Sequence, residues 1–235
     1  MRWSLSARIA AAVVSLVTGV QAADSFAFKD SDTGFLFQQY NAAYKIGSSI
    51  AYRVALPSQI NSTYPVIVQI AAPLEVGWAG LAWGGSMINN PLMACYANGA
   101  SVTISSRYAT GHSLPPVYTT PKYEILKSGT YTNRTHWKVT AKCTGCTSYI
   151  GANNKAVVLN ANGNNRFAFA YSGSKPSNPA SNTSSFPVHE VTNYWNHDFA
   201  AAKNADWTAL LSRNGVKGDA GDGGQSGGVE GGCHV

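Results

Sequence analysis

The sequence of 235 residues is poor in charge and in cysteine, and each shortage narrows what the chain can do. Only 12% of the residues are Asp, Glu, Lys or Arg, and no run of basic residues occurs, so the pattern of a nucleic-acid-binding protein is absent. No stretch after the N-terminal segment is apolar for long enough to cross a membrane. Four cysteines are too few to make a disulfide framework in a chain of this length.

Common catalytic motifs are also missing. The chain has no glycine-rich nucleotide turn after a strand, no phosphate-binding loop, no His-Glu-x-x-His pair and no nucleophile elbow. Its acidic residues show no paired arrangement typical of a glycosidase. The expected mature N-terminus, near Ala23, is not histidine, which excludes the N-terminal copper site of secreted polysaccharide monooxygenases. We therefore predict no catalytic residues.

The first 22 residues have the pattern of a secretory signal peptide. Arg2 and Arg8 supply the basic part, and an apolar stretch at 9–17, too short to span a bilayer, precedes small residues. We expect a secreted chain that begins near Ala23, in which the loss of two arginines lowers the formal charge from +6 to +4. Three N-glycosylation sequons agree with secretion, at Asn61, Asn133 and Asn182.

The cysteines are expected in three different states. Cys143 and Cys146 follow a strand-like segment as Cys-x-x-Cys, and in an oxidising compartment this favours a local disulfide over a redox dithiol. Cys95 lies in an apolar run and is expected to be a buried thiol. Cys233 lies near the C-terminus, and its state is left open.

Alternating apolar and polar residues predict strands over most of the chain. Many short strands without helices between them favour an all-β fold, an antiparallel immunoglobulin-like β-sandwich. Period-two segments lie at 48–56, 136–143 and 166–171, continuously apolar segments at 66–70 and 92–96, and turn residues at 32–34, 97–99 and 162–165. In the segment 136–143, we expect Lys138, Thr140 and Lys142 on a solvated face.

One helix is expected near the C-terminus, with Asn214-Gly215 as its end. The apolar face of this helix comprises Phe199, Ala202, Trp207, Leu210 and Leu211, with Asp206 close to it. The sequence then becomes glycine-rich, which is typical of a flexible segment. We predict a signal peptide at 1–22, one domain at 23–215 and a flexible tail at 216–235.

Methionine is scarce enough for each position to be considered. Met87 follows a Trp-Gly-Gly-Ser sequence, and two glycines permit the close backbone approach that a planar ligand requires. A thioether that fills a gap at the edge of the sandwich explains Met87 equally well, so both interpretations stay open. Met93 lies within an apolar run and is expected in the core.

Five histidines are candidates for a metal-binding role. His136 shares a polar face with lysines and is expected at the surface, and His234 lies in the tail. His197 is expected at the start of the terminal helix, as a capping or surface group. His112 and His189 remain, although a lone histidine among aromatic residues is more often structural than a ligand.

Several segments, taken in order, resemble the cytochrome domain of cellobiose dehydrogenase. They are Trp-Gly-Gly-Ser-Met at 83–87, Ala-Asn-Gly at 97–99, Ser-Arg-Tyr-Ala-Thr-Gly at 106–111, Thr-His-Trp-Lys at 135–138, Cys-Thr-Gly-Cys at 143–146 and Phe-Pro-Val-His at 186–189. The resemblance extends from about residue 32 to residue 215 and is more specific than any one motif.

This resemblance implies a β-sandwich that holds one haem b between an axial methionine and an axial histidine, which here are Met87 and His189. Such ligation fills both axial positions, favours one-electron exchange and raises the reduction potential. Thr147 follows Cys146, so the motif for covalent haem attachment is absent. The resemblance also implies the Cys143–Cys146 disulfide. The other haem-pocket residues that it implies are Trp83, Gly84, Gly85 and His112, the last where other members carry tyrosine near a propionate.

The leading hypothesis is a secreted electron-transfer protein, a monomer that binds neither nucleic acid nor membranes. Its implied donor is a secreted flavin dehydrogenase, and its acceptor is a copper polysaccharide monooxygenase, a quinone or a ferric complex. Without a dehydrogenase domain, its own activity is at most ferric or quinone reduction. One alternative is a haem-free carbohydrate-binding module with exposed aromatics, although Trp83, Trp137 and Trp207 are expected in the core. Another is the sensor of a membrane reductase.

Overall fold

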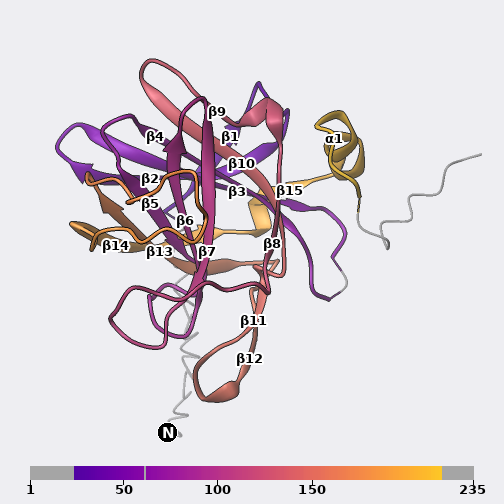
Figure 1. The fold of residues 1–235 in the computed structure, drawn as a ribbon. Helices are drawn as coiled ribbons and strands as arrows, with labels where there is room; N and C mark the ends of the chain where they lie inside the picture. The colour runs from indigo at the N-terminus through magenta and orange to yellow at the C-terminus, as the bar shows by residue number, and fades with distance from the viewer. Residues whose placement is uncertain (1–23, 61, 219–235) are drawn as a thin grey trace, which may run out of the picture.

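The computed structural model describes residues 24–60 and 62–218 (Figure 1). The expected signal peptide, Asn61 and residues 219–235 of the tail, with Cys233 and His234, lie outside the described residues. Within them the chain is built mostly of antiparallel strands in two main sheets, which confirms the predicted β-sandwich. None of the helices in this part of the chain is long and apolar enough to span a membrane.

The larger sheet has eight strands. Its order is β1 (Phe26–Lys29), β2 (Leu36–Lys45), β3 (Ser48–Pro57), β4 (Val66–Pro73), β10 (His136–Thr144) and β8 (Lys122–Ile125). Two short strands complete it: β15 (Lys203–Asn204) pairs in parallel with β3, and β9 (Tyr131–Thr132) pairs with β10.

The smaller sheet has five strands, all antiparallel. Its order is β14 (Val191–Asp198), β13 (Asn164–Ser172), β5 (Trp78–Ala82), β6 (Pro91–Asn98) and β7 (Ser101–Tyr108). Outside the two sheets lie the hairpin β11 (Ser148–Ile150) and β12 (Ala156–Val158), and the 3-10 helices η1 (Lys127–Gly129), η2 (Ala152–Asn154) and η3 (Ala200–Ala202). The five segments predicted as strands coincide with β3, β4, β6, β10 and β13.

The core lies between the two sheets because alternate side chains of each strand point inward. Tyr52 on β3, Val139 on β10 and Phe167 on β13 are fully or almost fully buried there, as is Trp83 after β5. Each such side chain contributes about 1.5–3 kcal/mol relative to an exposed one. A slip of one residue in any strand would expose its apolar set, so the core also fixes the register of the strands.

The outer face of the eight-stranded sheet is covered, and the prediction of a solvated face on β10 was wrong. Lys138, Thr140 and Lys142 are buried there. Lys138 forms ion pairs with Asp30 and Asp32, and the hydroxyl of Thr140 donates to the carbonyl of Gly129 in η1 at 2.8 Å. The alternation within β10 did not reveal these partners, because they lie outside the strand, and Asp30 and Asp32 lie more than 100 residues before Lys138. His136, the first residue of β10, is exposed as predicted.

The terminal helix is shorter than predicted. Helix α1 (Trp207–Arg213) begins eight residues after Phe199, because η3 and β15 occupy the segment before it. The side chain of Asn204 accepts a hydrogen bond from the backbone of Leu36 and donates one back, at 2.9 and 2.8 Å, which holds this segment extended against β2. The helix ends at Arg213 with Asn214 as its C-cap, so the predicted stop at Asn214-Gly215 is confirmed, and Gly215 adopts a φ of 72°.

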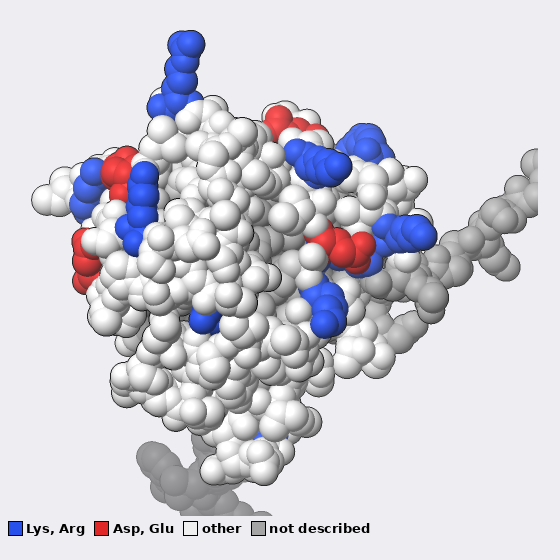
Figure 2. Space-filling model, in the orientation of Figure 1, with Lys and Arg blue, Asp and Glu red and all other residues white. Residues whose placement is uncertain are grey.

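Charged side chains are sparse on the surface. Figure 2 shows Lys, Arg, Asp and Glu scattered over one face of the molecule, without a continuous basic area. This agrees with the absence of basic runs in the sequence.

His197 is a core residue on β14, and its predicted place at the start of the helix was wrong. Its ring is fully buried, stacks on Phe167 at a centroid distance of 5.4 Å, and accepts a hydrogen bond at Nδ1 from Trp195 Nε1 at 3.0 Å. Burial lowers the pKa of His197 to about 3, against a smaller opposing effect of a hydrogen bond with the backbone of Gln38.

We expect acid to destabilise the fold through His197. The unfolded imidazole titrates near pH ~6.5, so between about pH 3 and 6.5 unfolding takes up a proton and stability rises with pH. Lowering the pH from 7 to 4.5 should cost roughly 2–3 kcal/mol through this residue. Urea unfolding of the wild type and His197→Gln at both pH values measures this, with the exposed His136→Gln as control. An equal loss of stability in His197→Gln and the wild type would refute it.

Candidate cofactor-binding site

The outer face of the five-stranded sheet is hollowed into a cavity of about 810 Å³. Three segments wall it: the loop 83–90 between β5 and β6, the loop 109–117 after β7, and residues 173–190 between β13 and β14, called the strap below. The strap crosses the sheet over β6 and β7, as Figure 1 shows in orange. The volume falls within the ~300–1,000 Å³ of typical small-molecule and cofactor sites.

The floor of the cavity contains a group of very small residues, next to the larger lining residues Trp78 and Leu92. Ala170 on β13, Gly80 on β5 and Ala94 on β6 are paired in one row across three strands, and Ala168 and Ala82 are paired in the next row. Larger residues at these outward positions would fill the space above the sheet. Small residues leave it flat, which suits a planar ligand. This stripe of Gly and Ala is present in the sequence as alternate residues of β5 and β13, but it was missed.

Met87 and His189 line this same cavity, although they lie 102 positions apart in the sequence. Met87 is half-buried in the loop 83–90, and His189 is exposed on the strap, two residues before β14 begins. The structure therefore brings a thioether and an imidazole to one cavity from two different segments.

The loop that carries Met87 is held by hydrogen bonds. The side-chain amide of Asn90 donates to the carbonyls of Ser86 and Ile88, at 3.1 and 3.0 Å, and its oxygen accepts from the hydroxyl of Tyr149 at 2.8 Å. A Cβ atom on Gly84 would lie 1.6 Å from that oxygen, so only glycine permits this arrangement. The loop then turns at Gly85, whose φ is 77°.

The other expected pocket residues fall into two groups. Gly85 and His112 line the cavity. Trp83 is not among the lining residues: it is fully buried between the sheets and meets Phe167 edge to face at 5.4 Å. Gly84 does not line the cavity either. Its lack of a side chain leaves room for the side chain of Asn90.

The walls of the cavity are cationic. Arg107 and Arg166 line it, and none of the lining residues that the structure describes is a carboxylate. The guanidinium of Arg166 stacks on the exposed ring of Tyr194 at 3.8 Å. Such walls favour a ligand with acidic groups. Neither arginine was predicted from the sequence to be a pocket residue, although Arg107 lies in the segment 106–111 that carries the resemblance.

These residues fit a haem, which is a flat and mostly apolar ring with two carboxylates. The row of small residues provides a flat surface, and the exposed Arg166 provides a cation for a carboxylate. Met87 and His189 provide the ligand types that hold haem iron in electron-transfer cytochromes.

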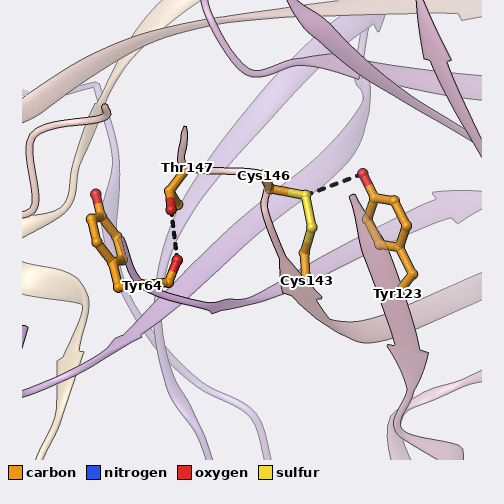
Figure 3. The surroundings of a disulfide bond; sticks show 5 residues. All are labelled: Tyr64, Tyr123, Cys143, Cys146 and Thr147. Atoms are coloured by element: carbon orange, nitrogen blue, oxygen red, sulfur yellow. Dashed lines mark hydrogen bonds between the residues drawn. A yellow bond between two sulfur atoms is a disulfide. The ribbon is translucent and has the colours of Figure 1, made fainter. Parts of the chain in front are cut away.

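The predicted disulfide lies outside the cavity lining. Cys143 and Cys146 form a disulfide at the end of β10, with their Cα atoms 5.9 Å apart (Figure 3). The Tyr123 hydroxyl lies 3.3 Å from the sulfur of Cys146 (Figure 3). The hydroxyl of Thr147 donates to the carbonyl of Tyr64 at 2.6 Å, which attaches the next residue to the segment before β4.

The structure also describes the third cysteine and two of the three glycosylation sequons. Cys95 is a free and fully buried thiol, as predicted, and burial raises its pKa. Asn133 and Asn182, both in glycosylation sequons, are exposed, and Asn182 lies on the strap.

The tryptophans give little support to a carbohydrate-binding face. All five that lie in the described ranges are buried, namely Trp78, Trp83, Trp137, Trp195 and Trp207. The predictions of a core position for Trp83, Trp137 and Trp207 are thus confirmed, and no exposed tryptophan platform exists in this part of the chain.

The fold and the cavity together define a cofactor-binding β-sandwich of the cytochrome class. The family model for the cytochrome domain of cellobiose dehydrogenase matches residues 28–209, and the chain belongs to this family. It is therefore a cytochrome domain of the type found in such dehydrogenases, and electron transfer is the function of this class.

Similar proteins agree with this assignment. The chain is 29% identical over 187 residues to a pyrroloquinoline quinone-dependent pyranose dehydrogenase of Coprinopsis cinerea, covering 78% of this chain and 25% of that protein. The chain thus spans about a quarter of the length of this relative.

Two solved structures are also similar. The cytochrome b domain of pyranose dehydrogenase from Coprinopsis cinerea has a TM-score of 0.72 and 25% identity, over 83% of this chain and 98% of that one. The cytochrome domain of Myriococcum thermophilum cellobiose dehydrogenase has a TM-score of 0.72 and the same coverage; at 22% identity, it supports the fold alone.

Proposed function

We propose that this chain binds one haem b without covalent attachment in the cavity on the five-stranded sheet, and that it relays single electrons. Met87 and His189 are the proposed axial ligands. The observation that carries this proposal is that both side chains line one cavity, although they lie on different loops. When bound, the haem supplies reversible one-electron exchange.

The protein residues have separate tasks in this proposal. Asn90 fixes the loop that presents Met87, and the strap presents His189. Because Met87 and His189 would both hold the haem iron, no free position would remain there for oxygen or a substrate. A relay function follows, and the chemistry on substrates belongs to its partners.

Partners are proposed to approach the mouth of the cavity. Leu114, Val188 and Tyr194 line the cavity and are large exposed hydrophobic residues, with Val188 82% exposed. Apolar side chains around an opening favour a contact with another protein. They lie beside Arg166 and His189, so a partner that covers them would reach the cofactor directly.

The proposed donor is a secreted sugar dehydrogenase. The sequence resemblance implies a flavin enzyme, while the Coprinopsis cinerea relative is a pyrroloquinoline quinone-dependent pyranose dehydrogenase. The proposed acceptors are a copper polysaccharide monooxygenase, a quinone or a ferric complex. We further propose a secreted monomer with its cytochrome domain at 23–215 and N-glycans at Asn61, Asn133 and Asn182.

Rapid mixing tests the relay. We expect the oxidised protein to be reduced by a sugar dehydrogenase, with a flavin or a quinone cofactor, only when the sugar is present. Addition of a ferric complex should then restore the oxidised spectrum. The absorbance bands of the haem report both steps. If the haem-loaded protein stayed oxidised with both types of dehydrogenase, the proposed relay would be wrong.

A further inference from the structure

Arg107 is a buried cation in the wall of the cavity. It lies on β7, its side chain is only 3% exposed, and it lines the cavity beside the strap. Burial of arginine is costly unless its donors are satisfied and its charge is balanced. The contacts of Arg107 satisfy the first condition and leave the second unmet.

The donors of Arg107 are satisfied by neutral oxygens. Nε donates to the hydroxyl of Ser105 at 2.7 Å, Nη1 to the carbonyl of Pro115 at 2.9 Å, and Nη2 to the carbonyl of Ser184 at 2.6 Å. A weaker bond from Nη2 reaches the carbonyl of Asn182 at 3.4 Å. One guanidinium therefore joins β7 to the loop 109–117 and to the strap.

The strap is attached to the sheet by a row of such bonds. Three neighbouring hydroxyls also donate to strap carbonyls: Thr103 to Pro179, Ser105 to Asn182 and Tyr96 to Ser181, each at 2.6 Å. Among these four side chains Arg107 makes the contact nearest to His189 in sequence, at Ser184, while the end of the strap is held at Glu190, whose carboxylate accepts from the Ser172 hydroxyl at 2.9 Å. Of these four side chains, it alone also holds the loop that carries His112.

The charge of Arg107 is not balanced by a carboxylate. Among the described residues no acidic side chain forms an ion pair with it. Burial lowers the pKa of the guanidinium, but an arginine stays protonated at any ordinary pH. A buried cation acts through a medium of low dielectric, so it disfavours further positive charge nearby.

We propose that Arg107 is a positioning residue of the cofactor site, which holds the His189-bearing strap in place and raises the reduction potential of the bound haem. This inference rests on the proposed function. The oxidised haem carries one more positive charge than the reduced haem. A fixed cation in the cavity wall therefore destabilises the oxidised form more and favours reduction.

Spectroelectrochemical titration of three haem-loaded variants tests whether the positive charge of Arg107 raises the reduction potential. Arg107→Gln removes the cation and should lower the equilibrium constant for reduction about tenfold, which is ~59 mV for a one-electron couple. Arg107→Lys keeps the cation and should retain most of the potential. Arg213→Gln removes the same charge from helix α1, which packs against the other sheet, and should leave the potential unchanged.

Hydrogen exchange tests the attachment of the strap without haem. In the haem-free protein, amides of residues 177–190 should exchange several-fold faster in both Arg107 variants than in the wild type or Arg213→Gln. If Arg107→Gln fails to fold, Ser105→Ala removes one partner of the guanidinium and one strap bond, and should give a smaller change in the same direction.

The possible results distinguish a failure of the proposed role of Arg107 from a failure of the proposed haem binding. An unchanged potential in Arg107→Gln, or an equal fall in Arg107→Lys, would overturn the electrostatic role. Unchanged exchange of the strap would overturn the positioning role. A wild-type protein that takes up no haem would instead refute the proposed function, and the effect on the potential with it.

Discussion

Haem-loaded His189→Ala protein is expected to lose the six-coordinate spectrum and to bind haem at least about 100-fold more weakly, since even the loss of an outer partner of a metal ligand costs ~10–100-fold. The exposed histidine lies on the strap at the cavity, so its removal should leave the core intact. Absorbance spectra and haem titration measure the two effects. Met87→Leu removes the other proposed ligand and should also abolish the six-coordinate spectrum. This volume-conserving change should lower the stability of the fold by less than ~1.5 kcal/mol.

His112→Ala is the matched control for this prediction. His112 also lines the cavity, from the loop 109–117, and carries the same functional group. Its replacement should keep the six-coordinate spectrum. If His112→Ala lost that spectrum and His189→Ala kept it, the ligand assignment would have to be exchanged.

Ala170→Leu is expected to weaken haem binding while the fold persists. Ala170 is paired with Gly80 in the floor of the cavity, so a leucine there would project into the space where a planar ligand lies. Overpacking of this kind costs ~1–3 kcal/mol, which corresponds to about a 5- to 150-fold loss of affinity. Haem titration measures the affinity, and thermal unfolding of the haem-free protein should show little change.

Ala43→Leu provides the comparison, because Ala43 is an exposed residue of β2 in the other sheet. It should bind haem as the wild type does. Normal haem binding by Ala170→Leu would place the haem away from this floor and would contradict the assignment of the cavity.

The strands could be predicted because period two is a local property of the sequence. The start of the helix could not, since Asn204 is held extended by Leu36, 168 residues away. The burial of Lys138 and Lys142 likewise depends on distant segments, namely those that carry Asp30 and Lys217. Local patterns therefore revealed the strands, but not what covers them.

The site was predictable only in part. The local sequence left Met87 equally open to a ligand role and a structural role, and it favoured a structural role for His189. The resemblance to a family singled both out. The small residues of the floor and the cationic wall depend on strand pairing, which sets Gly80 beside Ala94 and Ala170. Arg107 acquires its role from carbonyls of two loops, and these contacts have no sequence pattern.

The haem content of the purified wild-type protein tests the central claim most directly. After expression with sufficient haem, the pyridine haemochrome assay should give one haem b per chain. The absorbance spectrum should be that of a six-coordinate haem in both oxidation states. A protein that folds but shows no Soret band under these conditions would contradict the account.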